Sequence, residues 1–149
     1  MKITIICIGR IKEKFYNDAI SEYAKRLTPY TDLKIRELND ETDAELNSKA
    51  ILKELSKDAR SYDIALNIGG REYDSLSFAD KIESLKVSGI SHITFVIGGS
   101  DGFSDEVTSK CNESLSFSRF TFPYQLMRLI LTEQIYRAFK ISSGEPYHK

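Results

Sequence analysis

Short runs of β-branched residues alternate with longer amphipathic stretches along the chain, and this alternation restricts the fold more than any other feature. The β-branched runs cover residues 2–8, 33–38, 64–68 and 93–97. Such a pattern is typical of an α/β domain, in which helices cover both faces of an open, mostly parallel sheet. The chain has 149 residues and no internal linker, so we expect one domain over residues 1–149.

The amphipathic stretches predict the helices between these strands. Apolar side chains recur at helical spacing from Ile11 to Leu27, and Pro29 ends that stretch. Thr42 and Glu45 have the spacing of a capping box, which predicts a helix from there to about residue 60. Its buried stripe is expected to consist of Leu46, Ala50, Ile51 and Leu55. Further helices are expected at residues 78–87, after Ser104 as N-cap, and at 124–141 after Pro123.

The last of these helices, residues 124–141, carries apolar residues on more than one face. A surface helix needs a single buried stripe. The excess predicts burial on two sides, against the helix's own sheet and against a second subunit of a homodimer. A central helix in a monomer is the alternative.

Composition and charge exclude several classes of protein. The 21 Lys and Arg against 22 Asp and Glu leave a formal net charge of −1, so the chain is no bulk polycation that coats nucleic acid. Its apolar runs are far shorter than the roughly 20 residues that cross a bilayer. No signal peptide is expected, and Cys7 and Cys111 lack metal-site spacing. We therefore expect a cytoplasmic protein with free thiols, no membrane segment and no metal.

Two of the apolar runs end in the same tripeptide, Ile-Gly-Gly, at residues 68–70 and 97–99. Ligands bind outside the carboxyl ends of parallel strands, so two glycine turns there predict two walls of one crevice. Plain turns are the alternative. Asp105 and Glu106 occupy the first turn of the helix that follows, which argues against a phosphate site.

The titratable residues outline no hydrolytic triad. Of the two histidines, His92 is expected at a strand edge and His148 lies in the terminal Tyr-His-Lys. The last third is locally basic, which predicts that one face of the protein contacts phosphate groups. The alternative is an i,i+4 pair between Glu133 and Arg137 with the other charges solvated. The charges in this part are Arg119, Arg128, Arg137, Lys140 and Lys149 against Glu133 and Glu145.

Four segments together resemble the ribosomal RNA large subunit methyltransferase H family. They are KITIICIGRIKEKFYNDAISEYAKRL at the start, FVIGGSDGFS, LSFSRFTFPYQLMRLILTEQIYRAFKI, and GEPYHK at the end. The resemblance spans residues 1–149 and implies a SPOUT-type fold with a C-terminal trefoil knot. It also implies a homodimer that uses S-adenosylmethionine to methylate N3 of a pseudouridine in 23S rRNA within the assembled ribosome.

The resemblance also implies site residues at matching positions of this chain. The cofactor-binding positions would be Leu66, Gly98, Phe117, Ser118, Arg119, Phe120, Thr121 and Phe122. The catalytic positions would be Arg137, Tyr147, His148 and Lys149. The family often has His after the Phe-Pro that opens the last helix, where this chain has Tyr124, so Tyr124 receives no role.

The resemblance implies that residues of the last helix and of the C-terminal tail have separate catalytic roles. Arg137 and Lys149 would stabilise negative charge on the base, and His148 would orient or deprotonate it. A chain this small, with no appended RNA-binding domain, has little surface for reading naked RNA, which favours the assembled ribosome as substrate. The alternatives are a SPOUT methyltransferase for another RNA, such as tRNA, and a non-catalytic ribosome-associated binding module.

Overall fold

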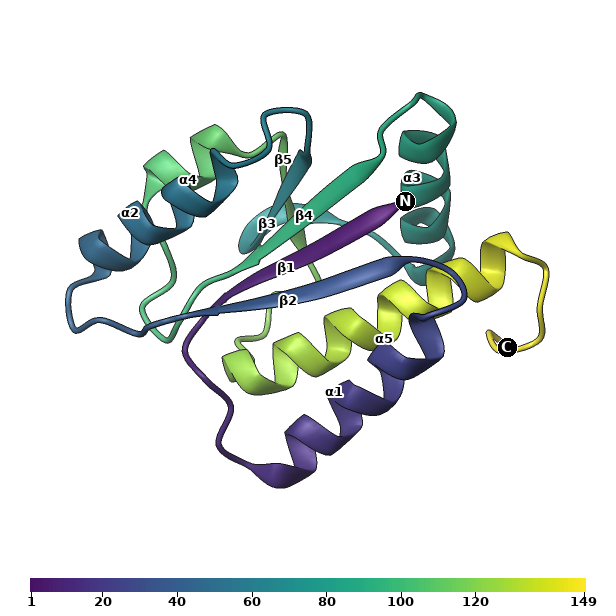
Figure 1. Ribbon diagram of the computed structural model, residues 1–149, viewed down its shortest axis with the longest axis horizontal. Coiled ribbons are helices and arrows are strands. Elements are labelled where there is room, and N and C mark those ends of the chain that lie inside the picture. Colours follow the sequence, from purple (N-terminus) through teal and green to yellow (C-terminus); the bar gives the residue numbers. More distant parts are fainter.

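A computed structural model describes residues 1–149 as one five-stranded sheet with five helices (Figure 1). The strands are β1 (Lys2–Ile8), β2 (Asp32–Leu38), β3 (Tyr62–Glu72), β4 (His92–Ile97) and β5 (Glu113–Ser116). The helices are α1 (Lys14–Leu27), α2 (Ala44–Leu55), α3 (Ser75–Val87), α4 (Asp105–Lys110) and α5 (Tyr124–Ser142). The strand order is β2-β1-β4-β3-β5 and every neighbouring pair is parallel. The predicted open parallel α/β sheet is confirmed.

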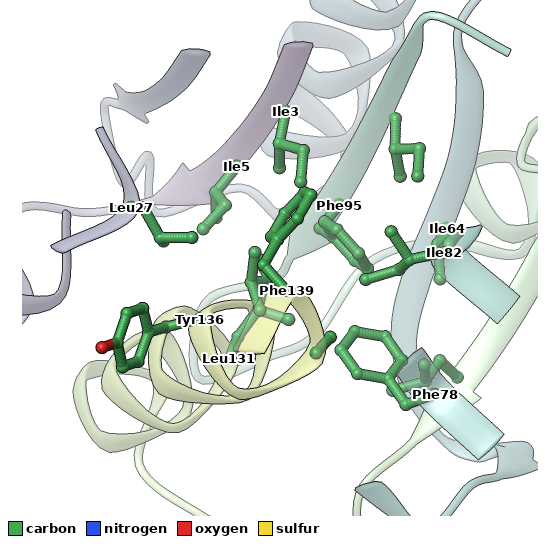
Figure 2. Packing of buried hydrophobic residues seen from close by; sticks show 14 of the residues in the cluster. Ile3, Ile5, Leu27, Ile64, Phe78, Ile82, Phe95, Leu131, Tyr136 and Phe139 are labelled. Atoms are coloured by element: carbon green, nitrogen blue, oxygen red, sulfur yellow. The ribbon is translucent and has the colours of Figure 1, made fainter. Parts of the chain in front are cut away.

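Helices cover both faces of this sheet and create two hydrophobic cores. Helices α1, α3 and α5 lie on one face, and α2 and α4 lie on the other (Figure 1). Successive side chains of a strand point to opposite faces, so Ile5 of β1 belongs to the larger core and Ile6 to the smaller. Figure 2 shows Ile5 and Phe95 of the sheet gathered with Phe139 of α5 in the larger core. The middle of the sheet is therefore buried on both sides.

Ile51 and Leu55 of α2 are buried as predicted, but polar side chains take the other core-facing positions of this helix. Its N-cap is Asp43, not Thr42, and the Asp43 carboxylate accepts the N–H of Glu45 at 2.9 Å. The helix ends at Leu55, short of residue 60. Asn47 and Ser48 are buried because both hydrogen-bond to neighbouring loops. Leu46, expected in the buried stripe, is 49% exposed.

Helix α1 begins at Lys14, three residues after the expected Ile11. Ile20 and Leu27 of this helix are buried as its spacing predicts. Phe15 is 66% exposed, and its ring lies 4.5 Å from the ring of Tyr16, between centroids, instead of entering the core.

The first Ile-Gly-Gly is not a turn, so the prediction of a glycine turn at residues 68–70 is wrong. Gly69 and Gly70 lie inside β3, which continues to Glu72. A Cβ on Gly70 would lie 2.6 Å from the carbonyl carbon of Ser114, so this glycine lets β3 pass close to the backbone of β5. The pairing of β3 with β5 shifts register between Leu66 and Arg71, around the glycines.

Cys7 and Cys111 are free and buried, and burial raises the pKa of each thiol to about 12. No group of three or more His, Cys, Asp or Glu side chains is placed to hold a metal. No helix combines the length and apolar character needed to cross a membrane. His92 is the first residue of β4, at the strand edge as expected, and its ring hydrogen-bonds to Thr4 and Asp58.

Candidate functional site

A cleft of about 860 Å³ opens at the carboxyl ends of β4 and β5 and beside the middle of β3. This edge is where ligands bind in open parallel sheets. Its first wall is residues 66–68 of β3, its second is the glycine loop at residues 97–103, and its third is the segment 115–118 with 120–125. Three segments that are separated in the sequence therefore line one cleft.

The glycine loop, residues 97–103, is tightly packed and needs its glycines. A Cβ on Gly98 would lie 2.9 Å from both the carbonyl carbon of Gly102 and Cδ1 of Phe103. Gly102 has a φ of +70°, in the left-handed region, and its N–H donates to the oxygen of Gly99 at 2.9 Å. The N–H of Ser104 donates to Ser48 Oγ of α2 at 3.1 Å. The second Ile-Gly-Gly is thus a turn that presents backbone to the cleft, as predicted.

The third wall is a hydroxyl-rich loop between β5 and α5. Ser116 Oγ donates to the oxygen of Ser118 at 3.0 Å, and Ser118 Oγ accepts the N–H of Phe120 at 3.0 Å. Arg119 is exposed and is not part of the wall. The other residues expected to hold the cofactor all line the cleft, namely Leu66, Gly98, Phe117, Ser118, Phe120, Thr121 and Phe122.

The beginning of α5 closes the cleft with Tyr124, Gln125 and Met127, and a buried arginine fixes this end of the helix. Arg128 is 2% exposed. Its Nη1 donates to Glu37 Oε2 of β2 at 2.6 Å and its Nη2 donates to the oxygen of Gly9, just after β1, at 3.0 Å. The sequence placed Arg128 in the basic last third, which could face phosphates. Because its side chain is buried and paired, Arg128 is not part of such a surface. The position of Arg128 among apolar residues of the predicted helix is the one sequence feature that could have indicated a buried ion pair.

The far end of α5 holds the C-terminal tail through one carboxylate. Glu133 Oε1 accepts Arg137 Nη2 at 2.6 Å, Arg137 Nε at 3.0 Å and the Tyr147 hydroxyl at 2.9 Å. Arg137 Nη1 donates to His148 Nδ1 at 3.2 Å. Burial, together with the hydrogen bond that its hydroxyl donates to Glu133, raises the pKa of Tyr147. The structure thus brings three of the expected catalytic residues together, and the expected Glu133–Arg137 pair is present; Lys149 is exposed at the chain end.

This tail cluster lies away from the cleft of the same chain. Arg137, Tyr147, His148 and Lys149 are all absent from the cleft lining. From Met127, which lines the cleft, α5 rises about 15 Å before it reaches Arg137, at about 1.5 Å per residue. A single chain therefore does not join the two sets of expected site residues.

A second cavity, of about 360 Å³, lies between the start of α3, the end of β5 and the middle of α5. Its apolar lining is Phe78, Leu115, Phe117, Phe122 and Ile130, and its polar lining is Tyr73, Asp74, Ser75, Ser116 and Gln134. Four of these residues also line the cleft: Leu115, Ser116, Phe117 and Phe122. Sequence reasoning missed this cavity because its walls come from segments that no local motif connects.

Comparison with known proteins agrees with this arrangement. The sequence profile of a family described as "Predicted SPOUT methyltransferase" matches residues 1–148. Two proteins called ribosomal RNA large subunit methyltransferase H, from Streptococcus uberis and Fusobacterium nucleatum, are 50% and 49% identical to this chain, with 100% of both chains covered. A solved structure described as a probable methylase family protein from Haemophilus influenzae has a TM-score of 0.61 at 18% identity, over 99% of this chain and 70% of that one. This last likeness concerns the fold.

Proposed function

Because this chain belongs to the ribosomal RNA large subunit methyltransferase H family of SPOUT methyltransferases, we propose that it methylates N3 of a pseudouridine in 23S rRNA, with S-adenosylmethionine as methyl donor. The observation that supports this most strongly is the cleft itself. Leu66, Gly98 and the loop after β5 come from distant parts of the sequence and line one hollow. These are the positions at which the family resemblance expects the cofactor.

The residues of the cleft fit an adenosine with a methionine tail. The volume of about 860 Å³ lies within the range of about 300–1,000 Å³ for small-molecule sites. The glycine loop offers backbone N–H and carbonyl groups, while Leu66 and Phe122 offer apolar walls. S-adenosylmethionine, when bound, supplies a methyl group that its sulfonium already activates. The chain's own task is then to orient the two reactants and to exclude water.

The acceptor nitrogen requires more from the protein. The imide N3 carries a proton at neutral pH, so that proton must be removed or the negative charge that develops must be stabilised. In this proposal Arg137 and Lys149 stabilise the charge, and His148 orients the base or accepts its proton. Tyr147 and Arg137 are held in place by hydrogen bonds to Glu133.

The proposed active form is a homodimer in which the tail of one subunit completes the cleft of the other. Leu126, Leu129 and Ile130 of α5 are only partly buried in the single chain, which leaves an apolar surface for a second copy. The separation of Arg137 from the cleft along α5 also favours a tail that comes from the partner.

Mixed dimers test this arrangement. One chain carries Gly98→Ala and an intact tail, and the other carries an intact cleft and lacks residues 147–149. At a cofactor concentration too low to saturate Gly98→Ala, a site across the interface predicts clear activity in verified heterodimers, although the homodimers of both variants are almost inactive. No activity in those heterodimers would contradict a tail that acts across the interface.

Methyl transfer to ribosomes tests the function. Purified ribosomes from cells that lack the gene, isolated large subunits and naked 23S rRNA are incubated with protein and labelled S-adenosylmethionine. We expect label at the target pseudouridine in assembled ribosomes only, because the small chain needs a preformed surface. Deletion of residues 147–149 should abolish transfer and leave cofactor binding intact. Absence of label from every substrate, with cofactor bound normally, would refute the proposal.

A further inference from the structure

The second cavity adjoins the cleft along one shared segment. Leu115, Ser116, Phe117 and Phe122 line both hollows, so groups bound in the two hollows would contact the same side chains. If the methyl donor occupies the cleft, the second cavity is the neighbouring space that can hold an acceptor. The residues that give this cavity its polar lining are not among the expected cofactor or catalytic residues.

The size and apolar lining of this cavity suit a flat ring. Its volume of about 360 Å³ is at the lower end of the range for small-molecule sites. Phe117, Phe122, Phe78 and Tyr73 contribute aromatic surfaces. Enzymes that act on a base inside folded nucleic acid take it out of its stack and hold it against aromatic and apolar side chains. The lining matches that requirement.

Two polar side chains of the cavity have hydrogen-bonding capacity left over. Gln134 Oε1 accepts from Ser75 Oγ at 2.8 Å, and Nε2 donates one hydrogen to Glu133 Oε2 at 2.8 Å, which leaves a second N–H for a ligand carbonyl. The Asp74 carboxylate caps α3 by accepting the N–H of Ser77 at 2.7 Å. That hydrogen bond holds the pKa of Asp74 below its usual range, so Asp74 is a charged acceptor with lone pairs to spare.

We propose that the second cavity receives the flipped target base and that Asp74 recognises it as pseudouridine by accepting its N1–H. Pseudouridine is joined to ribose through carbon, so its ring keeps an N1–H where uridine presents a C–H. Gln134 donates to a ring carbonyl that both bases share. This inference rests on the proposed function and assigns the substrate subsite, with the residue that selects the base, to a cavity outside the cofactor cleft.

The position of the cavity on α5 agrees with a dimeric enzyme. Leu126, Ile130 and Gln134 follow one another at intervals of four residues and share one face of the helix. The cavity therefore borders the face against which the second subunit is proposed to pack.

The test compares two ribosomal substrates. One set of ribosomes comes from cells that lack this gene and carries pseudouridine at the target, and the other comes from cells that also lack the pseudouridine synthase and carries uridine. Asp74→Asn is the test variant, because asparagine still caps α3 but puts an N–H donor where a carboxylate oxygen stood. Asp80→Asn, an exposed position on the same helix, removes the same charge as the control.

We expect the wild-type protein to prefer pseudouridine, and Asp74→Asn to lower kcat/KM on that substrate by about ten-fold to a hundred-fold, the usual effect of losing a hydrogen bond to a charged group. The value on uridine should change little, so the preference collapses while cofactor affinity and Tm stay the same. Asp80→Asn should behave as wild type.

The inference is overturned if Asp74→Asn retains the preference for pseudouridine, if it lowers both activities equally, or if the wild type has no preference. A wild-type protein that labels neither kind of ribosome overturns the proposed function, and the inference with it. The two failures are therefore distinguished by the wild-type measurement.

Discussion

Replacing Gly98 by alanine should weaken cofactor binding, because the glycine loop has no room for a Cβ. The added atom would lie 2.9 Å from the carbonyl carbon of Gly102 and from Cδ1 of Phe103, and the first of these is backbone, so the loop must move. Over-packing of this kind costs about 1–3 kcal/mol. If that strain acts on the cofactor-bound loop, affinity falls by about five-fold to 150-fold, at about 1.4 kcal/mol per ten-fold.

Isothermal titration calorimetry with S-adenosylmethionine and with S-adenosylhomocysteine measures this effect. Gly69→Ala is the matched control, since a Cβ there meets nothing within 4 Å and Gly69 lies outside the cleft lining. Gly70→Ala, whose Cβ would lie 2.6 Å from the carbonyl carbon of Ser114, should instead lower Tm by disturbing the pairing of β3 with β5. Wild-type affinity in Gly98→Ala, or an equal loss in Gly69→Ala, would refute the reasoning.

Three further predictions concern the tail, the thiols and the acid end of the stability curve. Glu133→Gln should lower turnover about ten-fold or more with cofactor affinity unchanged, because the tail loses its charged anchor; unchanged kcat would contradict this. Cys7 and Cys111 should react with iodoacetamide only after unfolding, since burial raises both pKa values to about 12; rapid labelling of the native protein, detected by mass spectrometry, would contradict it. The hydrogen bond from His92 lowers the pKa of Asp58, so its stabilisation is present above the unfolded pKa of about 3.9 and is lost as pH falls through the lower folded value. Denaturant unfolding should therefore show the stability difference between wild type and Asp58→Asn shrinking below about pH 4; a constant difference would count against it.

The strands were predictable because their signal is local. Runs such as residues 2–8 and 93–97 are rich in β-branched and apolar residues, as is typical of strands covered on both faces, and the structure has β1 and β4 there. The details of α2 were not predictable in the same way. Asn47 and Ser48 are buried because of hydrogen-bond partners at residue 41 and at Ser104, which no helical pattern within residues 44–55 reveals.

The candidate site shows the same division between local and distant information. The two Ile-Gly-Gly tripeptides are identical in sequence, yet one is a turn at the cleft and the other lies inside a strand. The difference at Gly70 comes from the backbone of Ser114 passing beside it. Neither alternative for the basic last third, a phosphate-facing surface or solvated charges, holds for Arg128, because its partners, Glu37 and the carbonyl of Gly9, are some ninety residues or more away in sequence. The individual cofactor positions came from family resemblance, not from periodicity.

The strand order has a consequence for how the chain folds during its own synthesis. Strand β4 lies between β1 and β3, so Lys2 pairs with His92 across the centre of the sheet. Until β4 emerges, β1 can pair only with β2, and β3 has neither of its neighbours. Pairing between segments so far apart in sequence is slow to form. About two thirds of the chain must therefore be made before the sheet can close around β4, and until then the nascent protein carries open strand edges that favour association with other chains.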